Sequence, residues 1–216
     1  MARKRHQGKI YDKERTKKKL ISAVGKILVK DGYSAIRINK IESVSGVTKK
    51  LIYDYFGGLN GLVKAYLNQV DFWKIAEQNI NAQKNVLNVE KGFLFNFLMN
   101  NFEYLFNSPE MQKVILWGIS EKNKTIRALT DERENVGEVI FQEADRIFDN
   151  TEIDFRATML VMVSSIYYTV LHIKTNGSKM CGIDMSNKEG QKRVFNAMEK
   201  ILELLYEFAN KGKNTK

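Results

Sequence analysis

Residues 32–56, GYSAIRINKIESVSGVTKKLIYDYF, decide the interpretation of this chain. Apolar residues recur at helical spacing over about residues 38–44 and again up to Tyr53, on either side of the turn-forming sequence Ser45-Gly46-Val47. Thr48 is suited to cap the second of these helices. Two short helices joined by a tight turn containing glycine are the pattern of a helix-turn-helix motif.

The rest of the sequence also predicts helices. One proline in 216 residues, with few β-branched runs of period two, favours an all-α protein. Residues 155–174 are apolar almost all the way round, so a helix there needs cover on more than one side. Apolar residues at helical spacing predict further helices over about residues 13–30, 60–79, 90–106, 109–120, 125–149, 155–174 and 191–210.

The excess positive charge lies in the first quarter of the chain. Residues 1–56 hold 15 Lys+Arg and 5 Asp+Glu, whereas residues 57–216 hold 20 of each. This asymmetry indicates a module that faces a polyanion, and it favours nucleic acid over anionic lipid. Basic tails also improve solubility, so charge alone leaves that alternative open.

Several classes of protein are excluded by composition and by missing motifs. Cys181 is the single cysteine, so no disulfide forms within the chain, and with only His6 and His172 the usual zinc sites lack ligands. The longest apolar run, residues 159–163, is far shorter than the roughly 20 residues of a membrane span, and no secretory signal is present. There is no phosphate-binding loop, dinucleotide glycine pattern or nucleophile elbow. We therefore expect a cytoplasmic protein that is not an enzyme, with no membrane segment, metal or cofactor.

Residues 32–56 resemble the DNA-binding domain of the tetracycline-repressor (TetR) family. The resemblance implies a three-helix helix-turn-helix domain followed by a C-terminal helical domain for ligand binding and dimerisation. We accordingly expect a flexible basic arm over residues 1–12, the DNA-binding domain over residues 13–58 and the larger domain over residues 59–216. Leu59 and Asn39 depart from the family, which usually places Lys at the first position and sometimes Arg at the second. The matching residues are Gly32-Tyr33, Ile38-x-x-Ile41, Gly46-Val47 and Tyr53-x-Tyr55-Phe56.

The predicted DNA contacts centre on Lys49 and Lys50. In the first turn of a helix, cations are disfavoured by roughly 0.3–1 kcal/mol each, so stability does not explain this pair. When such lysines face a phosphate group or the acceptor edge of a guanine, their electrostatic interaction becomes favourable. A recognition helix therefore accounts for both lysines. A solvated pair of charges is the simpler alternative. The full predicted set of DNA-contacting residues is Arg37, Lys40, Thr48, Lys49, Lys50, Tyr53 and Tyr55, with the two tyrosines included because of the family resemblance.

The resemblance further implies an operator, a partner copy and an effector. We expect a dimer, formed through about residues 155–174 and 191–210, to bind a pseudo-palindromic duplex and to release it when a small molecule binds. The candidate effector contacts, each of which also suits an ordinary core position, are Trp73, Phe97, Phe102, Trp117, Tyr167 and His172. An architectural DNA-binding protein without a ligand, and a protein attached to membranes by its basic end, remain open as alternatives.

Overall fold

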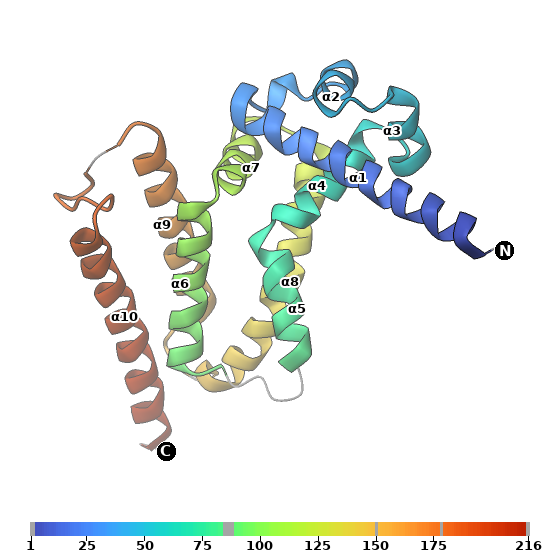
Figure 1. Ribbon diagram of the computed structural model, residues 1–216. Coiled ribbons are helices and arrows are strands. Elements are labelled where there is room, and N and C mark those ends of the chain that lie inside the picture. The colour runs from blue at the N-terminus through green and yellow to red at the C-terminus, as the bar shows by residue number, and fades with distance from the viewer. Residues whose placement is uncertain (1–2, 84–88, 150, 178, 215–216) are drawn as a thin grey trace. The chain divides into compact units, whose positions relative to one another are not determined.

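A computed structural model describes residues 3–83, 89–149, 151–177 and 179–214. Within these ranges the chain is helical, with one 3-10 turn, η1 (Tyr33–Ala35), and an isolated β-bridge but no strand, so the predicted all-α class is confirmed (Figure 1). The α-helices are α1 (Arg3–Asp31), α2 (Ile38–Ser45), α3 (Lys49–Phe56), α4 (Leu59–Val70), α5 (Phe72–Gln83), α6 (Lys91–Asn107), α7 (Pro109–Ser120), α8 (Lys124–Phe148), α9 (Phe155–Thr175) and α10 (Lys188–Asn214).

The chain divides into two compact units. Unit 1 comprises Met1–Lys74 and Pro109–Thr130, and unit 2 comprises Ile75–Ser108 and Asp131–Lys216. Unit 1 therefore contains α1–α4 together with α7, whereas unit 2 contains α6, α9 and α10. The domain boundary expected between Gly58 and Leu59 falls inside unit 1.

Helix α1 is the centre of unit 1, where it contacts α2, η1, α4 and α7. Gly25 allows α4 to approach α1 closely, because a Cβ atom at that position would lie 2.9 Å from Cε2 of Tyr66 on α4. Burial of each large apolar side chain contributes roughly 1.5–3 kcal/mol relative to exposure. The fully buried large side chains of this unit are Leu20, Ile27, Leu28, Ile41, Ile52, Leu62, Leu67 and Met111.

Two helix boundaries in unit 1 differ from those expected. Helix α1 begins at Arg3 instead of about Lys13, so residues 3–12 of the expected arm are helical, while Met1 and Ala2 lie outside the described residues. The helix expected over residues 60–79 is two helices, α4 and α5, with a break at Asp71. Asp71 is extended (φ −79°, ψ 122°), and its Oδ1 accepts hydrogen bonds from the N–H groups of Trp73 (3.0 Å) and Lys74 (3.3 Å). The carboxylate thus caps α5, which explains where the second helix starts.

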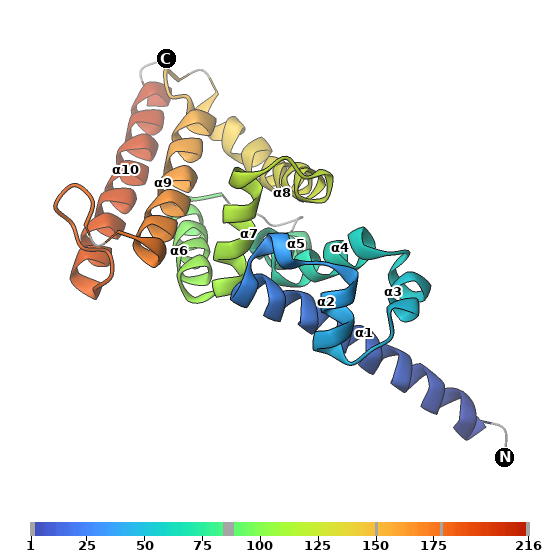
Figure 2. The ribbon, with the colours of Figure 1, turned by 90° about the horizontal axis from the view of Figure 1, so that it is seen from above.

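In unit 2, α6 packs against both α9 and α10 (Figure 2). The ring of Phe102 on α6 meets Phe195 on α10 edge to face, with 4.9 Å between centroids. The hydroxyl of Tyr206 on α10 donates a hydrogen bond to the carbonyl oxygen of Val89, just before α6, and burial raises the pKa of Tyr206 to about 12. These contacts fix α10 along α6. The break expected over residues 81–88 lies partly outside the described residues, because residues 84–88 are not described.

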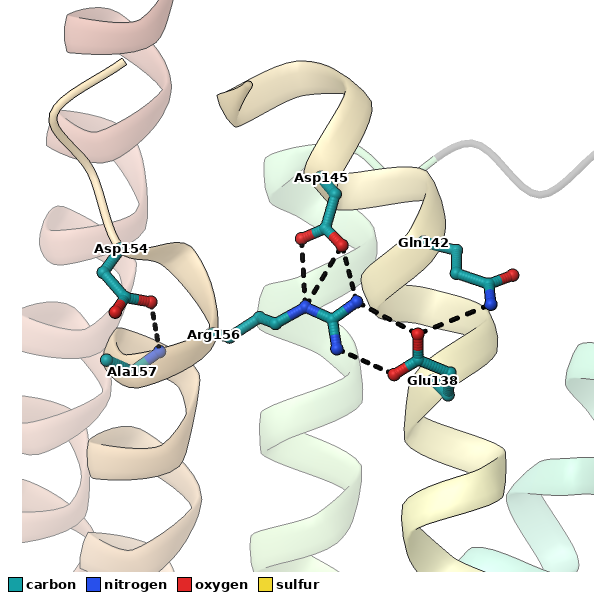
Figure 3. Close-up of polar contacts among 6 residues, drawn as sticks. All are labelled: Glu138, Gln142, Asp145, Asp154, Arg156 and Ala157. Carbon is teal, nitrogen blue, oxygen red and sulfur yellow. Dashed lines mark hydrogen bonds and ion pairs between the residues drawn. The ribbon is translucent and has the colours of Figure 1, made fainter. Parts of the chain in front are cut away.

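Arg156, near the start of α9, joins that helix to two carboxylates of α8 (Figure 3). Its Nη1 and Nη2 donate hydrogen bonds to Glu138 Oε2 (2.7 Å) and Oε1 (3.0 Å), and its Nε donates to Asp145 Oδ1 (3.1 Å). The guanidinium also lies 5.2 Å from the centroid of the Phe141 ring. Hydrogen bonding to Arg156 lowers the pKa of Glu138 and of Asp145, and the same bonds raise the pKa of Arg156. The three side chains form one bidentate cluster between α8 and α9.

A tight turn lies between α9 and α10, within the loop expected over residues 175–190. Met180 and Ile183 exchange backbone hydrogen bonds of 3.0 and 2.9 Å around the turn. Cys181 adopts a left-handed conformation (φ 51°) at its tip and is exposed, followed by Gly182 at φ 74°.

Candidate nucleic-acid interface

Helix α3 is held by one face and exposes the other. Ile52 is fully buried in the core of unit 1 and Leu51 is half-buried against it, whereas Lys49 and Lys50 are exposed and Tyr53 is 55% exposed. Gly46 ends α2 in the left-handed conformation (φ 66°), and its N–H donates to the carbonyl of Glu42 over 2.9 Å. This geometry turns the chain sharply enough for α3 to follow α2 after only Val47 and Thr48.

The two lysines at the start of α3 are uncompensated within the part of the chain that the structure describes. Neither Lys49 nor Lys50 forms an ion pair with a described residue. Their side chains extend from the helix end where the backbone dipole is positive, which is unfavourable for cations. The arrangement costs stability and offers two free ammonium groups to an anion.

The cap of α3 differs from the expected one. Thr48 occupies the N-cap position, but its hydroxyl makes no capping hydrogen bond. Instead, Glu42 on α2 accepts the Lys49 N–H at its Oε1 over 2.9 Å. A carboxylate therefore satisfies one free N–H at the α3 N-terminus and fixes α3 against α2. Thr48 remains exposed, with its hydroxyl available to a ligand.

The remaining predicted DNA contacts lie around α2 and α3 in different settings. Arg37 is exposed and its Nε donates to the carbonyl of Ser34 over 3.3 Å, while exposed Lys40 forms an ion pair of 3.3 Å with Asp31. Tyr55 is half-buried, with Lys13 Nζ 5.4 Å from its ring centroid.

The two departures from the TetR pattern fall in contrasting places. Leu59 opens α4 and packs, half-buried, against the core of unit 1. Asn39 on α2 is exposed. Leu59 thus has an ordinary packing role where the family usually has a cation.

The six candidate effector contacts are distributed between the two units. Trp73 and Trp117 belong to unit 1, whereas Phe97, Phe102, Tyr167 and His172 belong to unit 2. Trp117 stacks on Tyr33 with centroids 5.6 Å apart, and its Nε1 donates to Glu121 over 2.6 Å. Phe97 stacks with Phe93, and His172 stacks with Tyr168. Aromatic partners within the protein therefore already engage most of this set.

Sequence reasoning missed one buried polar side chain that stands out chemically. Asn101 on α6 is 2% exposed, and neither its amide nitrogen nor its amide oxygen has a hydrogen-bond partner among the described residues. Buried amides are normally paired, so such a group calls for an explanation. Asn101 lies next to Phe102 in an Asn- and Phe-rich helix, and nothing in that pattern distinguishes it from exposed Asn96 and Asn100 except its helical position.

Comparison with known proteins adds no family assignment. No protein-family model matches the chain, and no curated protein matches it significantly. The resemblance of residues 32–56 to the TetR family therefore rests on the residues that carry it.

Proposed function

We propose that the protein is a sequence-specific DNA-binding transcriptional regulator that acts as a homodimer. The observation that carries this proposal is α3: a helix anchored through Ile52, with free Lys49 and Lys50 and exposed Tyr53 on its outer side. A helix presented in this way suits the major groove, where lysine recognises guanine edges and phosphate. In the proposal α2 and α3 form a helix-turn-helix, and α3 is the recognition helix.

Dimerisation is supported by exposed apolar side chains on α9 and α10. Leu160 and Val161 on α9 are 67% and 68% exposed, and Leu204 and Phe208 on α10 are 51% and 52% exposed. Large apolar groups on two helices that both pack against α6 indicate a surface that another molecule covers. A second copy is the occupant we propose, because one recognition helix reads few base pairs whereas a two-fold pair reads half-sites about 34 Å apart.

Helix α9 also meets the length and composition of a membrane span, with 33% of its most apolar window buried. This differs from the expectation that no segment qualifies, which counted only unbroken apolar runs. Helix formation brings separated apolar residues such as Leu160 and Tyr168 onto the exposed surface. The dimer proposal predicts that the purified chain does not float with lipid vesicles, and flotation would contradict it.

The response to an effector is supported by Asn101. Its amide carries one NH₂ donor group and one acceptor inside unit 2, and a small neutral ligand with a carbonyl and an N–H or hydroxyl group would satisfy both. A thermal-shift screen of metabolites tests this part. A ligand that stabilises the wild type and weakens its DNA binding should lose its effect in Asn101→Leu, and an unchanged response would exclude Asn101 as the contact.

The DNA-binding proposal is tested by selecting bound fragments from genomic DNA with the purified protein. We expect one palindromic sequence to be enriched, and Lys49→Ala with Lys50→Ala to abolish the enrichment. The matched control removes two exposed lysines of the same unit, Lys122→Ala and Lys124→Ala, and should bind as the wild type does. Wild-type binding to many dispersed sites without a shared palindrome would favour the architectural alternative. No binding at low salt would end the proposal.

A further inference from the structure

Helix α1 has an outward face rich in cations, on which exposed Val29 also lies. The opposite side of the helix buries Leu20, Val24 and Leu28. At 100° per residue, the positions farthest from that buried side recur every three to four residues. We define the basic face of α1 as Arg15, Lys18, Lys19, Ser22, Lys26 and Lys30, all of which are exposed.

Within the described ranges, the cations of the basic face have no ion-pair partner. None of its five cations forms an ion pair with a described residue, although neighbouring Lys17 pairs with Glu14 over 2.9 Å. No Asp or Glu lies on this face between residues 15 and 30. A solvated helix usually alternates charges of both signs, so this concentration of one sign indicates an anionic partner.

Two shallow grooves flank the basic face. One, of about 430 Å³, lies between α1 and the end of α2, where Val44 and Ser45 line it opposite Arg15 and Lys19. The other, of about 760 Å³, lies between α1 and residues of α4 and α7, and Glu110 is the one carboxylate on its wall. Lys18, Ser22 and Lys26 line both grooves.

We propose that the basic face of α1 binds the sugar-phosphate backbone of nucleic acid, independently of sequence. The inference rests on the proposed function, because it extends the DNA contact of α3 to a second surface of unit 1. The first groove reaches Ser45, the last residue of α2 before the turn into α3.

The dimensions of the face match a phosphate track. At 1.5 Å per residue, positions 15 to 30 span about 22 Å, which corresponds to about six phosphates of one strand at 3.4 Å each. The grooves are open rather than enclosed, and cations form part of both linings, which suits an extended polyanion better than a small ligand. Backbone contacts add affinity and set orientation but carry no sequence information.

The test is the salt dependence of binding to two duplexes, one with the selected operator and one scrambled. We expect the triple variant Arg15→Gln, Lys18→Gln and Lys26→Gln to lower the slope of log affinity against log salt by about 0.9 for each phosphate that the variant no longer neutralises. At 0.1 M salt this amounts to an affinity about eightfold weaker for each such phosphate, equally for both duplexes. The matched control, Lys113→Gln, Lys122→Gln and Lys124→Gln, removes the same charge from the same unit and should leave the slope unchanged.

Two further measurements keep the result interpretable. Circular dichroism and the melting temperature establish that each variant folds, and Arg15→Lys with Lys18→Arg and Lys26→Arg should restore the wild-type slope. Polyglutamate serves as a competitor that presents carboxylates instead of phosphates. If the triple variant no longer binds polyglutamate but keeps its DNA slope, the face serves an acidic protein and the inference is overturned.

The failure of this inference is distinct from failure of the proposed function. An unchanged slope in a triple variant that still binds the operator overturns the role of the basic face and leaves the recognition helix in place. Weaker binding confined to the operator duplex, with scrambled DNA unaffected, also overturns it, because the contact would then read sequence. A wild-type protein that binds neither duplex overturns both proposals.

Discussion

Replacing Asn101 with leucine should stabilise the protein. Asn101 is 2% exposed on α6, and both polar atoms of its amide lack partners among the described residues. Leaving a buried polar group unsatisfied costs about 1–3 kcal/mol. Leucine has the same branching and removes both polar atoms, while its larger methyl groups cost part of the gain through tighter packing. We expect the free energy of unfolding to rise by roughly 1–2 kcal/mol.

The assay is urea unfolding followed by far-ultraviolet circular dichroism, with a melting curve beside it. A gain of about 1 kcal/mol corresponds to about 2–4 °C for a chain of this size. Asn100→Leu is the matched control, because it makes the same change at an exposed position of the same helix and should stay within about 0.5 kcal/mol of the wild type. Asn101→Ala removes the amide without adding volume. If both substitutions at position 101 destabilise the protein relative to the control, Asn101 is satisfied in solution and the reasoning is refuted.

Three further predictions concern unit 1 and the α8–α9 cluster. Glu42→Ala should lower the free energy of unfolding in urea by about 1 kcal/mol and weaken DNA binding, because it removes the cap of α3. Glu42→Gln should recover the part of that stability that comes from the hydrogen bond. Equal stability of the two variants would contradict this. Gly25→Ala should destabilise by about 1–3 kcal/mol, because its Cβ would press on the Tyr66 ring, and the loss should shrink in a Tyr66→Leu background. Arg156→Met should lower the free energy of unfolding at neutral pH, because it removes the partner of ionised Glu138 and Asp145. In the wild type this contribution is lost as the pH falls below about 4 and through the lowered pKa values of the two carboxylates, so the stability difference between variant and wild type should narrow in acid. A stability difference independent of pH would exclude the ionic contribution.

Much of the helical pattern was predictable because strong local signals mark it. Pro109 at a first helical position predicts α7 with the bounds observed, and glycine at position 46 predicts the turn between α2 and α3. The break at Asp71 was missed because apolar residues continue at helical spacing through Trp73 and Ile75. The break between α4 and α5 depends on tertiary structure, because the Asp71 carboxylate is buried there and must find hydrogen-bond donors in the protein. An exposed Asp in the same sequence could be solvated by water instead of capping a helix.

The candidate interface was predictable in position but not in detail. Exposed Lys49 and Lys50 are where helical periodicity places them, whereas the cap from Glu42 depends on the packing of α2 against α3, which local sequence does not specify. Aromatic content did not locate a common pocket, because aromatic side chains pack equally well with each other, as Trp117 does with Tyr33. Predicting that the Asn101 amide lacks hydrogen-bond partners would have required knowing which positions of α6 are buried.

The turn at residues 180–183 gives the protein a natural reporter. Cys181 is the single thiol of the chain and is exposed in the loop between α9 and α10, the helices of the proposed dimer face. A nitroxide attached there places one spin on each copy without any engineering of the sequence. A monomer carries a single spin and gives no dipolar modulation, so pulsed magnetic resonance reads self-association directly, and the distribution of spin separations would record whether DNA or an effector reshapes the pair.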